Sequence, residues 1–319
     1  MHRIGYLLSD GFQVMALASQ SVFEYANVAA GETFYRIENF SVAGGEVRSS
    51  LGMSVVTRAL GVRAAIDTWI AAGVSAPLTS PPPAEMLAFL RKAATRARRI
   101  AGICTGGFVL AEAGLLANRR ATTHWAHARD MMSRFPDIHV EEDRIYIVDG
   151  PIWTSAGMTA GLDLALGMVE KDLGADVARS VAHKLVMHQR RAGGQSQHSE
   201  MLDLAPKSDR IQEALNYARK NLRLPLTVEE LAGTAHLSPR QFSRVFTLET
   251  GQSPAKAIEG LRLEAARLMI EKSRHSLEVI ATETGFRDRR HMREAFIRGF
   301  GLPPQEVRRE ARAGDRIGV

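Results

Sequence analysis

The 319-residue chain is 45% hydrophobic and 24% charged, and its net charge of +6 arises entirely in residues 207–319, which hold 21 Lys and Arg against 15 Asp and Glu. Its single cysteine, Cys104, excludes an internal disulfide and indicates a reducing compartment, so we expect a cytoplasmic protein. The first apolar run, Ile4–Leu8, is too short for a secretory signal, and no run reaches the about 18 residues of a membrane span, which excludes a membrane protein.

Apolar runs of strand length alternate with helical patterns over residues 1–190. We expect strands at 3–8, 34–42, 54–57, 67–72 and 99–103, and a hairpin of 144–148 with 152–155. We expect helices at 16–30, after the prolines at 81–83, from 106 to 116, at 158–170 and at 177–188. This alternation predicts a layered α/β domain with a mostly parallel sheet. Residues 191–206 are polar and contain Gly-Gly and Pro, which predicts a linker.

Residues 207–319 show no strand pattern and contain an internal repeat. Three positions recur at an offset of 50, namely Phe246, Gly251 and Pro254 at Phe296, Gly301 and Pro304. Each copy predicts a short helix, a turn and a second capped helix. We expect helix starts at Thr227, Ser238, Ser276 and Asp288, the first two as capping boxes. The sequence therefore predicts an all-α domain with two helix-turn-helix units.

The second helix of each unit has a basic face. Arg240, Ser243 and Arg244 share one face of the first, and we expect Arg289, Arg290 and Arg293 to be free on the second. A guanidinium group donates two parallel hydrogen bonds to guanine edges or phosphates. A merely solvated helix face is the alternative for one such cluster. Two clusters in two repeats favour duplex DNA as the partner.

A helix at 255–272 is expected between the units, with Ile258, Leu261, Ala265, Leu268 and Met269 inward. At about 1.5 Å per residue it spans about 27 Å. That length favours two recognition helices in two adjacent major grooves.

This module resembles the DNA-binding domain of the AraC/XylS family over Ser208–Arg309. The resemblance rests on Leu-Ser-Pro-Arg at 237–240, Gly-x-Ser-Pro at 251–254, Arg-Leu-Glu-Ala-Ala-Arg at 262–267 and Gly-x-x-Pro at 301–304. It implies base contacts from Arg240, Ser243, Arg244, Arg289, Arg290 and His291. The second unit departs from the family pattern at Arg290, Met292 and Glu294, so the operator does not follow from relatives.

Cys104 stands where an expected strand runs into glycines and a helix. This arrangement resembles a nucleophile elbow, in which a sharp turn exposes the side chain beside the amides of the next helix. The helix start is expected to lower the pKa of the thiol. A small buried hydrophobic residue is the alternative for an unsupported cysteine.

Residues 1–175 resemble the PfpI-type, class I glutamine-amidotransferase-like domain, which implies a flavodoxin-like fold. The resemblance rests on four stretches: residues 4–12, the elbow at Cys104, the motif Arg-Arg-Ala-Thr-Thr-His-Trp at 119–125, and residues 154–163. A pair of Cys104 with His124 is implied, but Ala16 stands where catalytic relatives carry Glu, and Thr105 where protease-like relatives carry His. We therefore expect a ligand pocket on a degenerate, non-catalytic scaffold. The expected pocket residues are Cys104, Thr105, His124, Trp125, Ser155 and Gly157.

Together, these features predict a DNA-binding transcription regulator whose domain at 1–190 senses a small metabolite. AraC-type regulators with this N-terminal domain form a subgroup, which suggests a polar, nitrogenous effector. A homodimer is expected because two-fold symmetry matches paired half-sites. No cofactor is expected, and no metal, because His124 and His127 have no evident third ligand. The alternative functions are a cysteine hydrolase or deglycase fused to a DNA-binding domain and a redox sensor that uses Cys104. For Trp125, the alternative to a pocket residue is a core aromatic.

Overall fold

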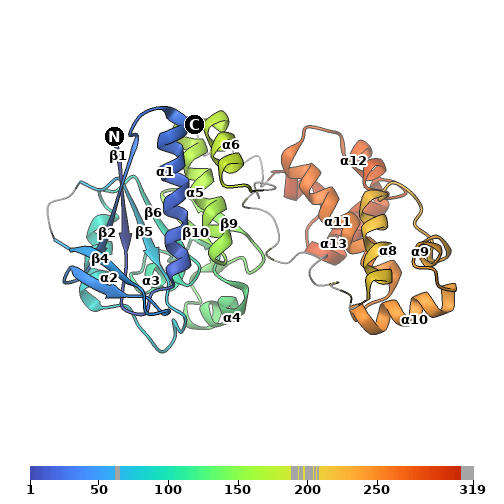
Figure 1. Cartoon of the computed structure of the whole chain (residues 1–319), viewed down its shortest axis with the longest axis horizontal. Coiled ribbons are helices and arrows are strands. Elements are labelled where there is room, and N and C mark those ends of the chain that lie inside the picture. The colour runs from blue at the N-terminus through green and yellow to red at the C-terminus, as the bar shows by residue number, and fades with distance from the viewer. Residues whose placement is uncertain are drawn as a thin grey trace. The chain divides into compact units, whose positions relative to one another are not determined.

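The computed structural model describes residues 1–61, 65–187, 193, 197, 204, 206 and 208–309. The chain divides into two compact units, Met1–Gln197 and His198–Val319 (Figure 1). The predicted boundaries, 1–190, 191–206 and 207–319, stay a prediction, because most of the expected linker lies outside the described residues. Among the helices described, none has the length and apolar character to span a membrane.

The first unit is built on an eight-stranded sheet in the order β3-β4-β2-β1-β5-β6-β10-β9. Its strands are β1 (His2–Leu7), β2 (Tyr35–Ser41), β3 (Gly45–Arg48), β4 (Ser54–Ala59), β5 (Thr68–Ala72), β6 (Arg99–Ile103), β9 (Tyr146–Asp149) and β10 (Ile152–Ser155). The inner strands run parallel, and β3 and β9 pair antiparallel at the two edges. A separate pair, β7 (Arg120–Ala121) and β8 (His139–Val140), lies outside this sheet. The predicted flavodoxin-like, mostly parallel α/β fold is confirmed.

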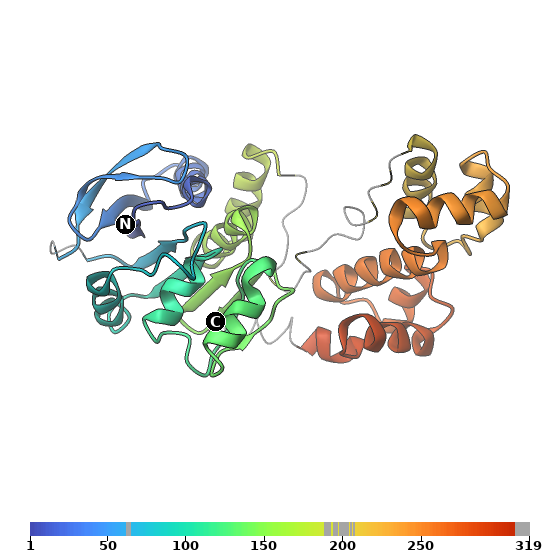
Figure 2. The same cartoon turned by 90° about the horizontal axis from the view of Figure 1, so that it is seen from below.

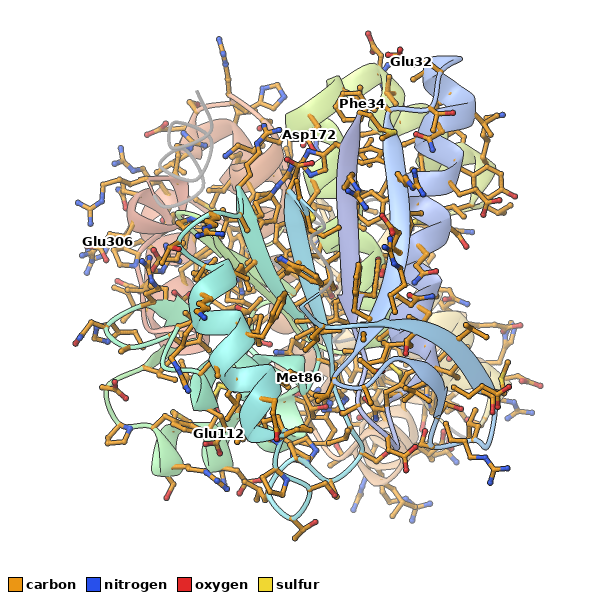
Figure 3. The ribbon with its side chains drawn as sticks, turned by 90° about the vertical axis from the view of Figure 1, so that its left-hand side faces the viewer. Glu32, Phe34, Met86, Glu112, Asp172 and Glu306 are labelled. Carbon is orange, nitrogen blue, oxygen red and sulfur yellow. The ribbon has the colours of Figure 1, made fainter. Side chains whose placement is uncertain are left out.

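Helices cover both faces of the sheet, so the unit has two cores. They are η1 (Val14–Ala18), α1 (Ser19–Ala30), α2 (Ala84–Ala93), α3 (Gly106–Glu112), α4 (Trp125–Arg134), α5 (Met158–Leu173) and α6 (Ala175–Lys184). The first core joins alternate β1 side chains to α1, α5 and α6. The second joins the opposite face to α2 and α3 and contains Met86, whose helix lies in front of the sheet in Figure 3.

Several elements differ from the sequence prediction. The helix expected at 16–30 starts as a 3-10 turn and becomes α-helical at Ser19. The expected helix to 116 ends at Glu112, because Gly114 takes a left-handed conformation with φ of 73°. The sequence prediction lacks strand β3 and helix α4. Strand β3 buries only Val47, so it has no apolar run to mark it.

The second unit is all-helical, as predicted. Its helices are α8 (Asp209–Lys220), α9 (Val228–Thr234), α10 (Pro239–Thr250), α11 (Pro254–Lys272), α12 (Leu277–Glu283) and α13 (Arg289–Phe300). Helix α11 lies between α8–α10 and α12–α13, as Figures 1 and 2 show in two views. It places Ala257, Ile258 and Leu261 in one core, and Leu263, Ala266 and Ile270 in the other.

This sharing of α11 corrects the predicted inward face. Ile258 and Leu261 are buried as expected, but Ala265, Leu268 and Met269 are only partly buried. A helix that serves two cores turns a different stripe to each, so a single amphipathic stripe does not describe it.

The predicted helix starts are confirmed at four positions. The side chains of Thr227, Ser238, Ser276 and Asp288 each accept a hydrogen bond from a backbone N–H in the first turn. Ser238 forms a full capping box with Gln241. The capping box predicted at Thr227 is wrong in its second half, because the Glu230 carboxylate accepts from the Tyr217 hydroxyl at 2.6 Å.

Gly285, in the turn between α12 and α13, is expected to be intolerant of a side chain. It has φ of +76°, and an added Cβ would overlap the Leu222 carbonyl oxygen. We expect Gly285→Ala to destabilise the second unit by about 2–4 kcal/mol through strain and overlap. Thermal unfolding followed by far-ultraviolet circular dichroism measures this change in the full chain.

Two controls isolate the effect. Gly233→Ala places a Cβ in open space on α9, so it should be neutral or mildly stabilising. All three tryptophans, Trp69, Trp125 and Trp153, belong to the first unit, so their fluorescence transition should stay at the wild-type temperature. An unchanged helical transition in Gly285→Ala would contradict the predicted strain.

Candidate functional site

The expected pocket residues gather at the carboxyl ends of two adjacent parallel strands. Cys104 follows β6, and Ser155 is the last residue of β10. The Cys104 amide donates to the Ser155 carbonyl oxygen at 3.1 Å. Ligands of open α/β sheets bind outside the carboxyl ends of the strands. The fold therefore brings these residues to the edge where a binding site is expected.

The backbone at Cys104 forms the predicted elbow. Cys104 has φ of 56°, a left-handed conformation that is uncommon for a residue with a Cβ. The turn also needs glycine beside it, because a Cβ on Gly73 would overlap Thr105 Oγ1, and one on Gly106 would overlap the Ala71 carbonyl oxygen. The Thr105 hydroxyl donates to the Val74 carbonyl oxygen at 2.7 Å and fixes the turn against the end of β5.

The Cys104 thiol is not exposed by this turn. The residue is 4% exposed and belongs to the core between the sheet and α1, α5 and α6. Burial raises the pKa of the thiol, and hydrogen bonds from Thr105 oppose this only in part. The expected lowering of the pKa is therefore wrong, because desolvation of the thiolate outweighs the start of a seven-residue helix. Ala16 lies in the same core, and its side chain does not supply the carboxylate that catalytic relatives carry at this position.

His124 caps helix α4, and this role fixes its ring. Its Nδ1 accepts a hydrogen bond from the Ala126 amide at 3.2 Å. A neutral histidine whose Nδ1 accepts carries its proton on Nε2. The ring edge faces Gly157, where an added Cβ would lie 3.2 Å from Cδ2 and 3.7 Å from Nε2. In this tautomer Nε2 carries the proton and lies on the side of Gly157.

Trp125 lies beside His124, with ring centroids 5.5 Å apart. It is 54% exposed, so the alternative of a core aromatic is wrong. Ser155 and Thr105 are fully buried. The structure thus places Cys104, Thr105 and Ser155 inside, with His124, Gly157 and Trp125 toward the outside.

Thr123 links the two groups and was missed in the sequence. Its hydroxyl donates to the Cys104 carbonyl oxygen at 3.1 Å, and the residue is fully buried. The 119–125 motif contains Thr123, but the predicted pocket includes only the histidine and tryptophan of that motif. Within the described ranges, no group of three His, Cys, Asp or Glu side chains is placed to hold a metal ion.

The first recognition helix, α10, presents its basic residues to solvent. Arg240 and Arg244 are exposed, and neither forms an ion pair with any residue that the structure describes. Ser243 lies between them and is half-buried. Phe242 and Phe246, on the opposite side, are fully buried in the core of this unit.

The second recognition helix, α13, differs. Arg289 pairs with Glu278 at 3.0 Å, and Arg290 pairs with Glu294 at 3.0 Å. The expectation that both arginines are free is therefore wrong, because each has a carboxylate within reach on a neighbouring turn or helix. Arg293 is exposed, and His291 is half-buried with its ring against Phe286.

An α/β unit joined to two capped helix-turn-helix cores is the architecture of a DNA-binding regulator. Two family models match the chain: a DJ-1/PfpI family at residues 16–171 and a helix-turn-helix domain at 231–310. The HTH-type transcriptional regulator GlxA of Rhizobium meliloti is 32% identical, over 98% of this chain and 97% of its own. The chain belongs to the AraC family of transcription regulators that carry an N-terminal DJ-1/PfpI domain.

Two further similarities concern the first unit. Isonitrile hydratase of Pseudomonas putida is 37% identical over 148 residues, which cover 46% of this chain and 61% of that protein. A crystal structure of an AraC family transcriptional regulator from Pseudomonas putida matches with a TM-score of 0.53. It covers 58% of this chain and all of that one, and at 22% identity it supports the fold alone.

The buried thiol leads to a testable reactivity. Because burial raises the pKa of Cys104, the thiol is neutral at neutral pH and should react slowly. We expect its rate with Ellman's reagent to be at least about tenfold below that of the denatured chain at the same pH. The rate should rise only at alkaline pH, where the thiolate forms.

The assay is unambiguous because Cys104 is the single thiol, and Cys104→Ser supplies the blank. A folded chain that reacts as fast as the denatured one, or faster, would contradict the buried, neutral thiol.

Proposed function

We propose that this regulator responds to a small metabolite bound by residues 1–190 and transmits the response through residues 191–206 to a DNA-binding domain at 207–319. The observation that carries the proposal is the pair of capped recognition helices, α10 and α13, held on two cores by the shared helix α11. One rigid connecting helix suits two adjacent major grooves of duplex DNA on one face.

The proposed base and phosphate contacts come from the exposed faces of α10 and α13. They are Arg240, Ser243, Arg244, Arg289, Arg290, His291 and Arg293. Within the described part of the chain, Arg240 and Arg244 form no ion pair, so both guanidinium edges can reach the duplex, which supports a leading role for α10. A homodimer through the first unit would place four such helices on paired half-sites.

The proposed effector site surrounds the elbow, with Cys104, Thr105, His124, Trp125, Ser155 and Gly157 as its residues. The exposed Trp125 ring offers a face for a polar or cationic nitrogenous group. The site is proposed to bind without catalysis. Three observations support this: the raised pKa of Cys104, the capping role of His124 and the aliphatic Ala16.

A cysteine hydrolase or deglycase is the second candidate, favoured by the likeness to isonitrile hydratase and by the elbow itself. Catalysis by cysteine needs a thiolate and a base that generates it. The buried thiol and the tautomer of His124 argue against both. The same burial argues against Cys104 as a peroxide sensor, since sensing cysteines are accessible and low in pKa.

Arg244→Ala is expected to weaken binding by about 1–3 kcal/mol if Arg244 reads a base. The probe is a duplex that the full chain selects from a random library, titrated by fluorescence anisotropy at fixed salt. Arg219→Ala, on the exposed side of α8, is the matched control and should bind as the wild type does. Equal affinities of the Arg244 variant and the wild type would remove Arg244 from the interface.

His124→Ala is expected to abolish the metabolite response and to leave basal DNA affinity unchanged. The full chain is screened with amino acids, betaines and polyamines, because a true ligand raises the unfolding temperature by mass action. Tryptophan fluorescence follows the first unit, which holds all three tryptophans. A thermal shift that survives in the variant means that the effector binds elsewhere.

A further inference from the structure

Gln197, the last residue of the first unit, is anchored next to the candidate effector site. Its side-chain Nε2 donates to the Thr123 carbonyl oxygen at 2.9 Å and to the Glu142 carbonyl oxygen at 2.8 Å, with Thr122 Oγ1 at 3.3 Å. Its Oε1 accepts from the Trp125 amide at 2.9 Å. Its own amide donates to Asp143 Oδ1 at 2.9 Å.

These partners are selective for a primary carboxamide. A carboxamide nitrogen has two donors and its oxygen accepts, which matches two backbone carbonyls on one side and an amide on the other. A carboxylate of the same shape would turn a second acceptor toward the carbonyl oxygens of Thr123 and Glu142 and lose both donors. The residues around Gln197 therefore form a specific hydrogen-bonding site. We call it the carboxamide site and define it as Thr122, Thr123, Trp125, Glu142 and Asp143.

The carboxamide site is continuous with the elbow. Thr123 donates through its hydroxyl to the Cys104 carbonyl oxygen, and it accepts from Gln197 through its own carbonyl. Trp125 opens helix α4 directly after His124, whose ring satisfies the next amide, that of Ala126. Gln197 thus completes the capping of α4 that His124 begins.

We propose that the carboxamide site is an intramolecular binding site that Gln197 fills, and that an effector bound at the elbow releases it. The second unit begins at the residue after Gln197. While Gln197 occupies the carboxamide site, the residue that precedes the second unit is held beside helix α4. When the site is emptied, that residue is released. This proposal rests on the proposed function for its regulatory consequence, and its structural part stands without it.

The Trp125 amide is a specific reporter of occupancy. The first amides of a helix have no acceptor within the helix, so they exchange quickly unless another group caps them. Hydrogen exchange resolved by NMR on the full chain should show the Trp125 amide protected in the wild type. Protection should be lost in Gln197→Ala and Gln197→Glu. The control Asp137→Asn changes an exposed carboxylate outside the carboxamide site, so it should retain protection.

The chemical class of the occupant is tested by refilling the emptied site. Propionamide added to Gln197→Ala should restore protection of the Trp125 amide, and propionate should not. A Trp125 amide that exchanges freely in the wild type would overturn occupancy by Gln197. Equal effects of propionamide and propionate would overturn selectivity for a carboxamide.

Coupling to DNA is measured separately, by titrating the full chain with its selected duplex. Gln197→Glu should change the affinity about fivefold or more, and the control Asp137→Asn should not. Loss of Trp125 protection with unchanged DNA affinity would overturn the coupling and leave the site standing. Failure of the proposed function has a different signature, since Arg244→Ala would then bind like the wild type.

Discussion

The first unit depends on the close approach of two backbone segments at the carboxyl ends of β5 and β6. Gly73 and Gly106 allow it, because a Cβ on either would overlap the opposing chain. That contact forces Cys104 into a left-handed turn, and the turn directs its thiol into the core. The geometry that makes a nucleophile accessible in an enzyme is here combined with burial. The fold keeps the elbow as a rigid support on which His124, Thr123 and Trp125 are arranged.

The second unit depends on α11 in an analogous way. Two small cores share this one helix, so α10 and α13 both pack against it. Arg262 strengthens the arrangement by donating to the Leu224 carbonyl oxygen at 2.6 Å and to those of Leu222 and Pro225. This arginine belongs to the basic excess of residues 207–319, yet it holds a loop in place, so net charge alone overstates the surface offered to DNA.

Much of the architecture could be predicted because its signals are local. Strand periodicity, capping residues and the helix-ending glycines Gly251 and Gly301 each specify a short segment. What could not be predicted depends on contacts between distant segments. The burial of Cys104 is set by the packing of α1, α5 and α6, and the bonds of Gln197 join positions more than 50 residues apart. The ion pair of Arg289 with Glu278 could not be predicted either, because the turn between α12 and α13 decides how close the two helices lie.

The pairing of charges differs between α10 and α13, so the proposed DNA contacts of the two helices are unequal. An arginine gains affinity by releasing counterions from phosphates, and Arg240 and Arg244 are free of ion pairs to do so among the residues described. Arg290 must first leave Glu294, an exposed pair worth about 0.2–1 kcal/mol, and the carboxylate it leaves repels phosphates. A glutamate in the major groove is tolerated where it accepts from a cytosine amino group. If the proposed contacts hold, we expect α10 to supply more of the salt-dependent affinity and α13 to discriminate more strongly against bases that offer no donor to Glu294.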